Sequence, residues 1–125
     1  MKIIPIEDFK RIYESEVFKN DFLDLFGKSK GDIKTYKNFL LRCLNLLDKE
    51  GLNVLDLSQF EQLRDTNPRL YAIRHPNSRI NERHIFIVAC DEERFILLTS
   101  FLEKNKNDYK KAIIKAQNIY EKLEW

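Results

Sequence analysis

The spacing of apolar residues changes near Pro68 in this 125-residue chain, and it returns to the helical period near the C-terminal end. Before Pro68, apolar residues recur about every 3.6 residues, as on one face of an amphipathic helix. Beyond it, apolar and polar residues alternate, as in strands with one face against a core. Helices that precede and follow a block of antiparallel strands indicate the α+β fold class.

The first half is predicted to contain a short strand and two helices, with the strand over 2–6, a helix over 7–26 that breaks at 20–21, and a second helix over 32–50. Pro5 places the strand at a sheet edge. Asp32 is a suitable cap for the second helix, and Gly51 a suitable end. Residues 53–63 remain ambiguous between a turn of helix and a loop.

The second half is predicted to contain three strands, over 70–75, 83–90 and 94–101, and a last helix capped by Asn107 or Asp108. The sequence DEER at 91–94 gives a tight hairpin turn, and HPNSRINE at 75–82 a longer one. We therefore expect a single domain, 1–125. Residues 1–59 form its strand and helical half, and 60–125 its meander and final helix. The expected sheet is small and antiparallel, built from the N-terminal strand and the three-stranded meander.

Composition limits the compartment and the cofactors. The chain is 43% hydrophobic and 34% charged, which is typical of a folded protein with a charge-rich surface. Cys43 and Cys90 each lie in an apolar run, and two thiols make neither a disulfide framework nor a metal cluster. No apolar run approaches the roughly 18 residues of a membrane span. We expect a reduced, cytoplasmic protein that uses no membrane, metal or cofactor.

Positive charge is concentrated in one segment, although the formal net charge is only +2. Residues 69–84 contain four arginines and one glutamate. Alternation places Arg74 and His75 on opposite faces of one strand, and Arg83 and His84 on opposite faces of the next. The charge therefore gathers at one end of the sheet. Because the planar guanidinium donates to phosphate through two N–H groups, this segment predicts a site for a polyanion.

Each of these side chains also has an ordinary structural explanation, which the sequence leaves open. Arg69 and Arg79 fit solvated loop residues. Arg74 and Arg83 fit salt bridges, for which three acidic residues qualify: Glu61, Asp65 and Glu82. The two histidines fit hydrogen-bonded surface or core groups, although an ordinary pKa near 6.5 also suits proton transfer.

A second basic cluster follows the last predicted strand and contains Lys104, Lys106, Lys110 and Lys111. The end of this strand should lie beside the sheet, so that Lys104 or Lys106 faces the same groove as the arginines. Tyr109 falls on the first turn of the final helix. Free amides at the start of that helix are expected to add to anion binding.

Three stretches together resemble a known family: LYAIRHP, ERHIFIVACDEERFILLTSFLEKNKND and KKAIIKAQ. They are similar to the HigB branch of the RelE/ParE toxin superfamily in pattern and order, over residues 60–125. Proteins of this kind are small cytoplasmic endoribonucleases that cut mRNA, often on the ribosome, and are neutralised by an antitoxin. The resemblance implies a RelE-like fold and two partners, a cognate antitoxin protein and mRNA.

The resemblance assigns roles to individual residues. Arg74 matches the strand arginine after LYxIR, Arg83 the arginine that opens the next strand, and Lys104 one of the lysines that follow the aromatic position of Phe101. Two aromatic positions of the family match Phe86 and Phe101. The chain departs from the family pattern at three places: Thr99 replaces a histidine, Glu103 replaces a lysine, and Asn107-Asp108-Tyr109 replaces a Thr-Pro step.

The residues and the resemblance together predict a metal-independent endoribonuclease. Its candidate catalytic residues are Arg74, Arg83, His75, His84, Lys104 and Tyr109. Its candidate RNA contacts are Arg69, Arg79, Lys106 and Lys110. Cleavage by the 2′-hydroxyl of the RNA needs a base, positive charge on the phosphorane and an acid for the leaving 5′-oxygen. The arginines are expected to hold the phosphate, and the histidines, with Tyr109 or a lysine, to move the protons.

Two alternatives use the same fold without cleaving RNA. One is a toxin of the ParE type that acts on DNA gyrase. The other is a protein-binding module whose ancestral catalytic activity has decayed. Thr99 and Glu103 favour these alternatives, whereas the concentration of arginine and histidine at one end of the sheet favours the nuclease.

Overall fold

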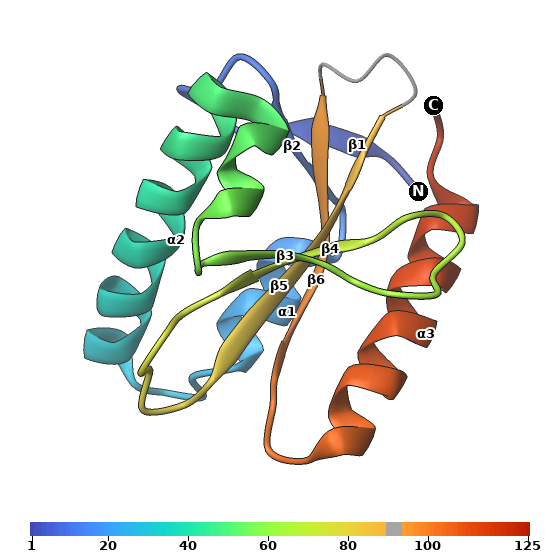
Figure 1. The fold of residues 1–125 in the computed structure, drawn as a ribbon. Coiled ribbons are helices and arrows are strands. Elements are labelled where there is room, and N and C mark those ends of the chain that lie inside the picture. Colours follow the sequence, from blue (N-terminus) through green and yellow to red (C-terminus); the bar gives the residue numbers. More distant parts are fainter. Residues whose placement is uncertain (90–93) are drawn as a thin grey trace.

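Residues 1–89 and 94–125, which a computed structural model describes, contain one six-stranded sheet with helices on both faces (Figure 1). The elements are, in chain order, β1 (Ile3–Pro5), β2 (Ile12–Ser15), α1 (Phe18–Asp24), α2 (Lys30–Glu50), the 3-10 helix η1 (Gly51–Asp56), β3 (Phe60–Gln62), β4 (Tyr71–Arg74), β5 (Glu82–Val88), β6 (Phe95–Leu102) and α3 (Lys106–Lys122). The strand order is β1-β2-β6-β5-β4-β3.

The α+β class is confirmed, but the sheet is larger than predicted and is mixed. β2 pairs with β6 in parallel, whereas the other pairings among the described strands are antiparallel. The expectation of a wholly antiparallel sheet is therefore wrong. The sequence did not predict β2 and β3, because they have only four and three residues. Such short strands do not show enough alternation to be distinguished from other patterns.

Residues 12–15 form a strand where the sequence predicted a helix. Ile12 and Ser15 are buried, and Ser15 Oγ donates a hydrogen bond to the Leu98 carbonyl oxygen of β6 at 2.9 Å. The apolar spacing in this region is compatible with a helix, but pairing with a distant strand determines the outcome.

Helix α1 begins at Phe18 and continues through residues 20–21, where the sequence predicted a break. The Asp21 carboxylate accepts a hydrogen bond from Thr99 Oγ1 at 2.7 Å and lies 2.9 Å from Lys115 Nζ. These contacts attach α1 to β6 and to α3. A polar residue that normally favours a turn is therefore held within the helix by its distant partners.

The second helix begins and ends close to its predicted bounds. Ser29, not Asp32, is the cap, because its hydroxyl accepts a hydrogen bond from the Asp32 amide at 3.3 Å. The helix ends at Gly51 as predicted, where φ is +59°, a conformation that favours glycine. The ambiguous residues 53–63 contain the end of η1 and strand β3.

The predicted meander is confirmed as β4, β5 and β6. Cys43 is buried on α2, as expected of a small apolar residue, and burial raises the pKa of its thiol to about 12. The predicted DEER turn and Cys90 include residues 90–93, which lie outside the described residues.

A β-bulge interrupts the pairing of β5 with β6. Ile85 lies opposite Thr99, but its neighbour Phe86 lies opposite Leu97, so Leu98 is an extra residue of β6. The alternation of β6 therefore shifts by one residue at this point.

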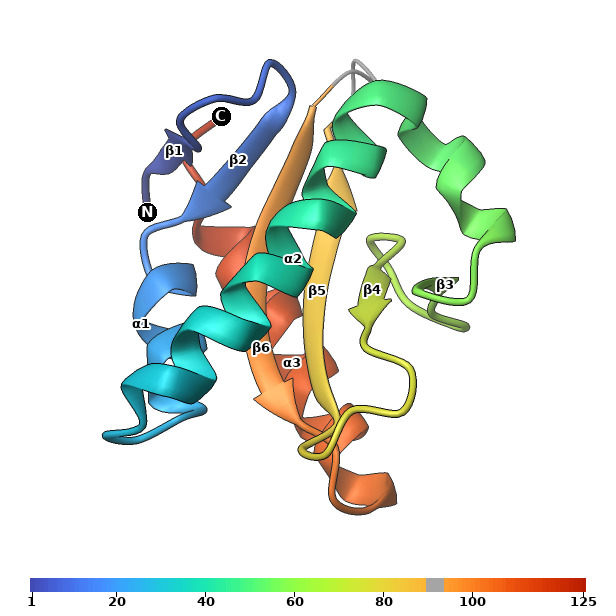
Figure 2. The same cartoon turned by 90° about the vertical axis from the view of Figure 1, so that its left-hand side faces the viewer.

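Each face of the sheet has its own apolar core, because α2 crosses one face and α3 the other (Figure 2). On the α2 face the core residues of the sheet are Ile12, Tyr71, Ile73, Phe86, Phe95 and Leu97. On the α3 face they are Leu70, Ala72, Ile85, Ile87, Ile96 and Leu98, which cluster with Ala112, Ala116 and Ile119 of α3. With both faces covered, most polar groups lie at the ends and edges of the strands, and those within the strands, such as His84 and Ser100, are paired with each other.

A capping box begins α3, two residues before the earlier of the two predicted caps. Asn105 Oδ1 accepts a hydrogen bond from the Asn107 amide at 2.9 Å. The Asp108 carboxylate accepts from the amides of Lys104 and Asn105, at 2.7 and 2.9 Å. These hydrogen bonds satisfy amides that would otherwise be free.

Asn105→Ala is expected to lower the free energy of unfolding by about 1 kcal/mol, because alanine cannot accept the hydrogen bond from the Asn107 amide. Urea denaturation followed by circular dichroism measures this. Asn118→Ala is the control, since Asn118 is exposed within the same helix and alanine has the higher helix propensity. Equal destabilisation by both changes would contradict the capping role.

Within residues 1–89 and 94–125, none of the helices has both the length and the apolar character needed to cross a membrane.

Candidate functional site

Arg74 and Arg83 lie directly opposite each other on neighbouring strands, β4 and β5. Residues paired in this way project from the same face of a sheet. Ala72 and Ile85, which share that face, belong to the α3 core. Both arginines therefore point toward α3. Two like charges in this position are unfavourable unless anionic groups compensate them.

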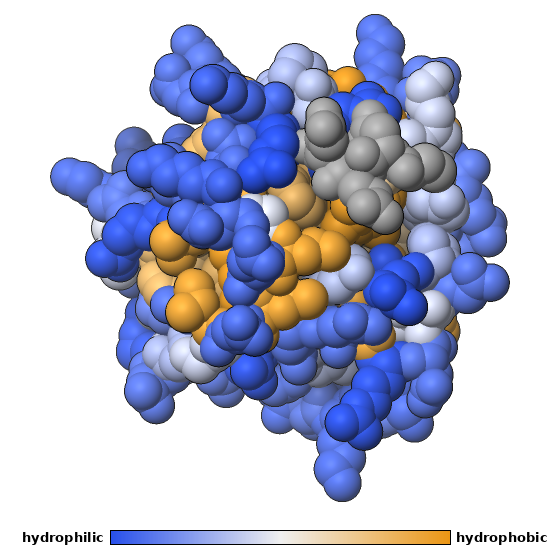
Figure 3. Space-filling view, turned by 45° about the horizontal axis from the view of Figure 1, so that its top comes forward, coloured by the Kyte–Doolittle hydropathy of each residue, from blue (hydrophilic) through white to orange (hydrophobic). Residues whose placement is uncertain are grey.

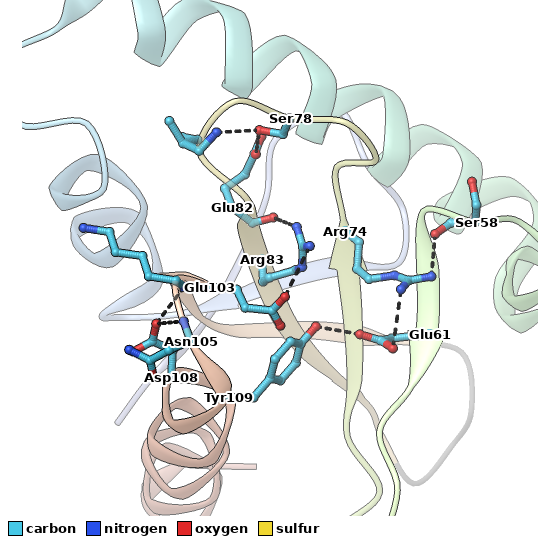
Figure 4. Close-up of polar contacts among 12 residues, drawn as sticks. Ser58, Glu61, Arg74, Ser78, Glu82, Arg83, Glu103, Asn105, Asp108 and Tyr109 are labelled. Atoms are coloured by element: carbon cyan, nitrogen blue, oxygen red, sulfur yellow. Dashed lines mark hydrogen bonds and ion pairs between the residues drawn. The ribbon is translucent and has the colours of Figure 1, made fainter.

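Five residues form what we call the two-arginine cluster: Glu61, Arg74, Arg83, Glu103 and Tyr109 (Figure 4). Arg74 Nη1 lies 3.9 Å from Glu61 Oε2, and Arg83 Nη2 lies 3.7 Å from Glu103 Oε1. Backbone carbonyls also hold the guanidinium groups. Arg74 donates to the Ser58 oxygen at 3.0 Å, and Arg83 to the Glu82 oxygen at 2.9 Å.

Tyr109 lies at the centre of the cluster, on the first turns of α3. Its hydroxyl donates a hydrogen bond to Glu61 Oε1 at 2.6 Å. Burial raises the pKa of Tyr109, and the hydrogen bond to Glu61 and the charge of that carboxylate raise it further. Tyr109 therefore keeps its proton at neutral pH and can act as a hydrogen-bond donor.

The Nε atoms of Arg74 and Arg83 are both buried without a hydrogen-bond partner among the described residues. Buried hydrogen-bond donors are nearly always paired in folded proteins, so two unpaired donors in one cluster need an explanation. An Nε–H and a neighbouring Nη–H form the pair of donors with which arginine holds phosphate or carboxylate. The cluster thus contains unused donors suited to an anion.

The charges of the cluster balance without a ligand, because two guanidinium groups face two carboxylates. Glu61 and Glu103 have side chains that are 30% and 33% exposed, whereas the Arg83 side chain is 12% exposed. The carboxylates can move toward water more easily than Arg83 can. An incoming phosphate would therefore compete with carboxylates that lie nearer to solvent.

The structure does not bring the two histidines to this cluster. His75 lies on the α2 face, where its Nδ1 is 2.5 Å from Glu82 Oε2 and its ring stacks on Phe39 with centroids 3.6 Å apart. Glu82 is fully buried and also accepts a hydrogen bond from Ser78. His75 therefore belongs to a buried polar group that supports the β4–β5 hairpin.

His84 is buried on the same face, beside Phe18 and Phe22, and its Nδ1 lies 2.7 Å from Ser100 Oγ. Burial first, and then the charges of His75 and Arg83, lower the pKa of His84 to about 3. The prediction that these histidines move protons at the arginine site needs correction, since the sheet separates them from Arg74 and Arg83.

His84→Gln is expected to make stability less sensitive to acid. His84 stays neutral when folded but titrates near pH 6.5 when unfolded, so the unfolded state binds the extra proton. Wild-type stability is then complete above pH 6.5 and falls by about 1.4 kcal/mol per pH unit below it, toward pH 3. Urea denaturation between pH 5 and pH 7.5 compares the two proteins, whose other titrating groups are shared. Parallel pH profiles would contradict the assignment.

The lysines predicted for the site lie on its margin. Lys104, Lys106 and Lys110 are exposed around the start of α3. Glu103, not Lys104, reaches Arg83. The capping box uses the amides of Lys104, Asn105 and Asn107 and places the Asp108 carboxylate at this helix start, which is unfavourable for an anion there.

The two remaining predicted contacts lie elsewhere. Arg79 donates to both carboxylate oxygens of Asp32 on α2, each at 3.2 Å. Arg69 precedes β4, and with Tyr71 and Trp125 it lines a cavity of about 470 Å³. The same cavity reaches Val88, at the opposite end of β5 from Arg83. Figure 3 views the upper end of the molecule, where apolar side chains gather within a charged surface.

Two residues of the cluster were missed as functional candidates. Glu61 was considered only as a salt-bridge partner, and the stretch around it gave no clear element. Glu103 was noted only as a departure from the family pattern. The only signal for Glu61 was its place among the acidic residues that could pair with Arg74.

Neither the comparison with protein-family models nor the comparison with curated proteins finds a match for this chain.

Proposed function

We propose that the two-arginine cluster is the active site of a metal-independent endoribonuclease of the RelE/HigB kind, the family that residues 60–125 resemble. One observation carries the proposal. Arg74 and Arg83 are in register, and the Nε of each is buried without a hydrogen-bond partner among the described residues, while Glu61 beside Arg74 accepts a hydrogen bond from Tyr109. This combination supplies cations, a base and a proton donor, which are the groups that RNA cleavage needs.

In the proposed reaction, Glu61 takes the proton of the 2′-hydroxyl, and the oxygen attacks the adjacent phosphorus. Arg74 and Arg83 stabilise the negative charge of the phosphorane. The bond from phosphorus to the 5′-oxygen breaks as Tyr109 gives its proton to that oxygen. Products are a 2′,3′-cyclic phosphate and a free 5′-hydroxyl. The 2.6 Å hydrogen bond then lets Glu61 return a proton to Tyr109, so that both groups are restored.

The biological role follows from the resemblance. As the toxin of a toxin–antitoxin pair, the protein would act in the cytoplasm and inhibit translation by cutting mRNA, on or off the ribosome. A cognate antitoxin protein would neutralise it by covering or distorting the cluster. Co-expression with the product of an adjacent open reading frame should then relieve growth inhibition.

The test uses the chemistry of the substrate. The intact protein is incubated with single-stranded RNA in excess EDTA, with and without ribosomes, beside a strand of the same sequence that is 2′-deoxy throughout. RNA should yield fragments with 2′,3′-cyclic phosphate ends, and the deoxy strand should stay intact. Cleavage of the deoxy strand, or intact RNA under both conditions, would overturn the proposal.

A second candidate is a binding module on the same fold, including a gyrase-directed toxin. The observation that favours it is the pairing of both arginines with carboxylates, Glu61 and Glu103. This candidate predicts that RNA survives intact while the protein inhibits growth. An assay of gyrase supercoiling would then identify the ParE-type branch.

A further inference from the structure

We propose that the RNA strand leaving the two-arginine cluster continues along a lysine-bearing face of α3, so that efficient substrates extend several nucleotides beyond the cleaved bond. This inference rests on the proposed function and adds the path of the strand. The face is defined by Lys111, Lys115 and Lys122.

These three lysines share a groove. They line a cavity of about 410 Å³, whose apolar wall includes Val17, Ile114 and Ile119. Residues four apart lie on one face of a helix, about 6 Å apart along its axis, and Lys122 follows about 10 Å further on. The apolar wall can support the stems of the lysines while the ammonium groups remain in water.

The groove is connected to the two-arginine cluster. Lys111 and Lys115 also line a smaller cavity of about 210 Å³, together with Thr99 and Phe101 of β6. Phe101 lies opposite Arg83 in the sheet, and its ring meets the Tyr109 ring edge-to-face with centroids 5.0 Å apart. One aromatic residue therefore contacts the cluster and also forms part of the wall next to the lysines.

The positive charge of this face is only partly neutralised. Lys115 pairs with Asp21 at 2.9 Å. Among the ion pairs of the described residues, none includes the side chain of Lys111 or Lys122. The cluster, in contrast, is balanced by Glu61 and Glu103. The lysines of α3 would thus attract the phosphates of an RNA strand electrostatically. The cluster by itself would attract them only weakly, because its charges are balanced.

RNA explains this arrangement better than an acidic protein segment, because the lysines continue directly from a site built for a phosphodiester. Lysines that contact phosphates position a strand without reading its bases. The contribution of the face should therefore be independent of sequence, should grow with RNA length and should weaken with salt. Each phosphate contact on single-stranded RNA adds about 0.7 to the slope of log affinity against log salt.

The experiment removes the three charges and varies the substrate length. The variant Lys111→Gln/Lys115→Gln/Lys122→Gln is compared with Lys30→Gln/Lys34→Gln/Lys49→Gln, which removes three exposed lysines from α2 on the other face of the sheet. Each protein is tested on a fluorogenic dinucleotide and on a labelled single-stranded RNA of about 12 nucleotides. Circular dichroism confirms that both variants fold.

We expect the α3 variant to raise KM for the long RNA by roughly tenfold and to reduce its salt slope by about 2. The kcat of the α3 variant on the long RNA, and its kinetics on the dinucleotide, should match those of wild type. The α2 variant should match wild type on both substrates. Equal effects of the two variants, or an unchanged KM for the long RNA, would overturn the path along α3 and leave the nuclease proposal standing.

Failure of the nuclease proposal would look different, because wild type would then leave both substrates intact. Fluorescence anisotropy with the long RNA decides the path in that case. Binding that only the α3 variant weakens would support an RNA track on a protein that does not cleave. Absence of RNA binding, with binding of a labelled polyglutamate peptide through the same lysines, would overturn the inference in favour of an acidic protein partner.

Discussion

Arg83→Ala is expected to lower kcat for RNA cleavage by about 10²–10³-fold, a loss comparable to removal of one donor from an oxyanion hole. The side chain is 12% exposed and its Nε has no hydrogen-bond partner among the described residues, which in the proposed reaction suits it to stabilise charge that develops on the phosphorane. Arg83→Lys should recover only part of the rate, because an ammonium cannot present two parallel N–H donors. Single-turnover cleavage of an end-labelled RNA measures both variants.

The control for this change is Arg42→Ala. Arg42 is exposed on α2, where its guanidinium lies over the Phe39 ring, 5.7 Å from the centroid. Loss of this arginine should leave kcat within about threefold of wild type, since changes at surface positions away from the site have small effects. A similar loss in both variants, or full activity of Arg83→Ala at unchanged stability, would exclude Arg83 from the reaction.

Glu61→Gln is expected to lower kcat by about 10²–10⁴-fold with little change in KM, as on loss of a general base. The amide oxygen of glutamine can still accept the hydrogen bond from Tyr109, but it cannot take the proton of the 2′-hydroxyl. Steady-state kinetics on a fluorogenic RNA separate kcat from KM. The variant should retain RNA binding, which anisotropy measures directly.

Glu103→Gln is the matched control, because it makes the same chemical change at the other carboxylate of the cluster. Glu103 contacts Arg83 but has no hydrogen bond to Tyr109 among the described contacts. Its neutralisation should lower KM, since it removes a competitor for the phosphate, and should leave kcat near the wild-type value. If Glu61→Gln and Glu103→Gln gave the same result, Glu61 would have no special role as the base.

The local pattern predicted the placement of the arginines only in part. Alternation put each arginine on the opposite face from its neighbouring histidine, but the β4–β5 register, which alternation does not specify, brings Arg74 and Arg83 to one face. The same register puts both histidines on the other face. The histidines were included because their ordinary pKa suits acid–base work, and burial of His84 removes that property.

The contact between Tyr109 and Glu61 could not be predicted from local pattern. Tyr109 and Glu61 are 48 residues apart, and they meet only because α3 packs across the face that β3 and β4 share. The parallel pairing of β2 with β6 is also a contact between distant segments. Such contacts depend on the packing of the whole domain, which a single sequence specifies only indirectly.

The extra residue, Leu98, determines which side chains of β6 face each side of the sheet. Up to Leu98, even-numbered residues of β6 face α3, whereas beyond Leu98 odd-numbered residues do. Phe101 therefore contacts Tyr109, and Ser100 contacts His84 on the other face. Glu103 follows this second set toward Arg83. A strand one residue shorter would direct this aromatic and this carboxylate to the other layer, so the length of β6 determines whether Phe101 and Glu103 reach the two-arginine cluster.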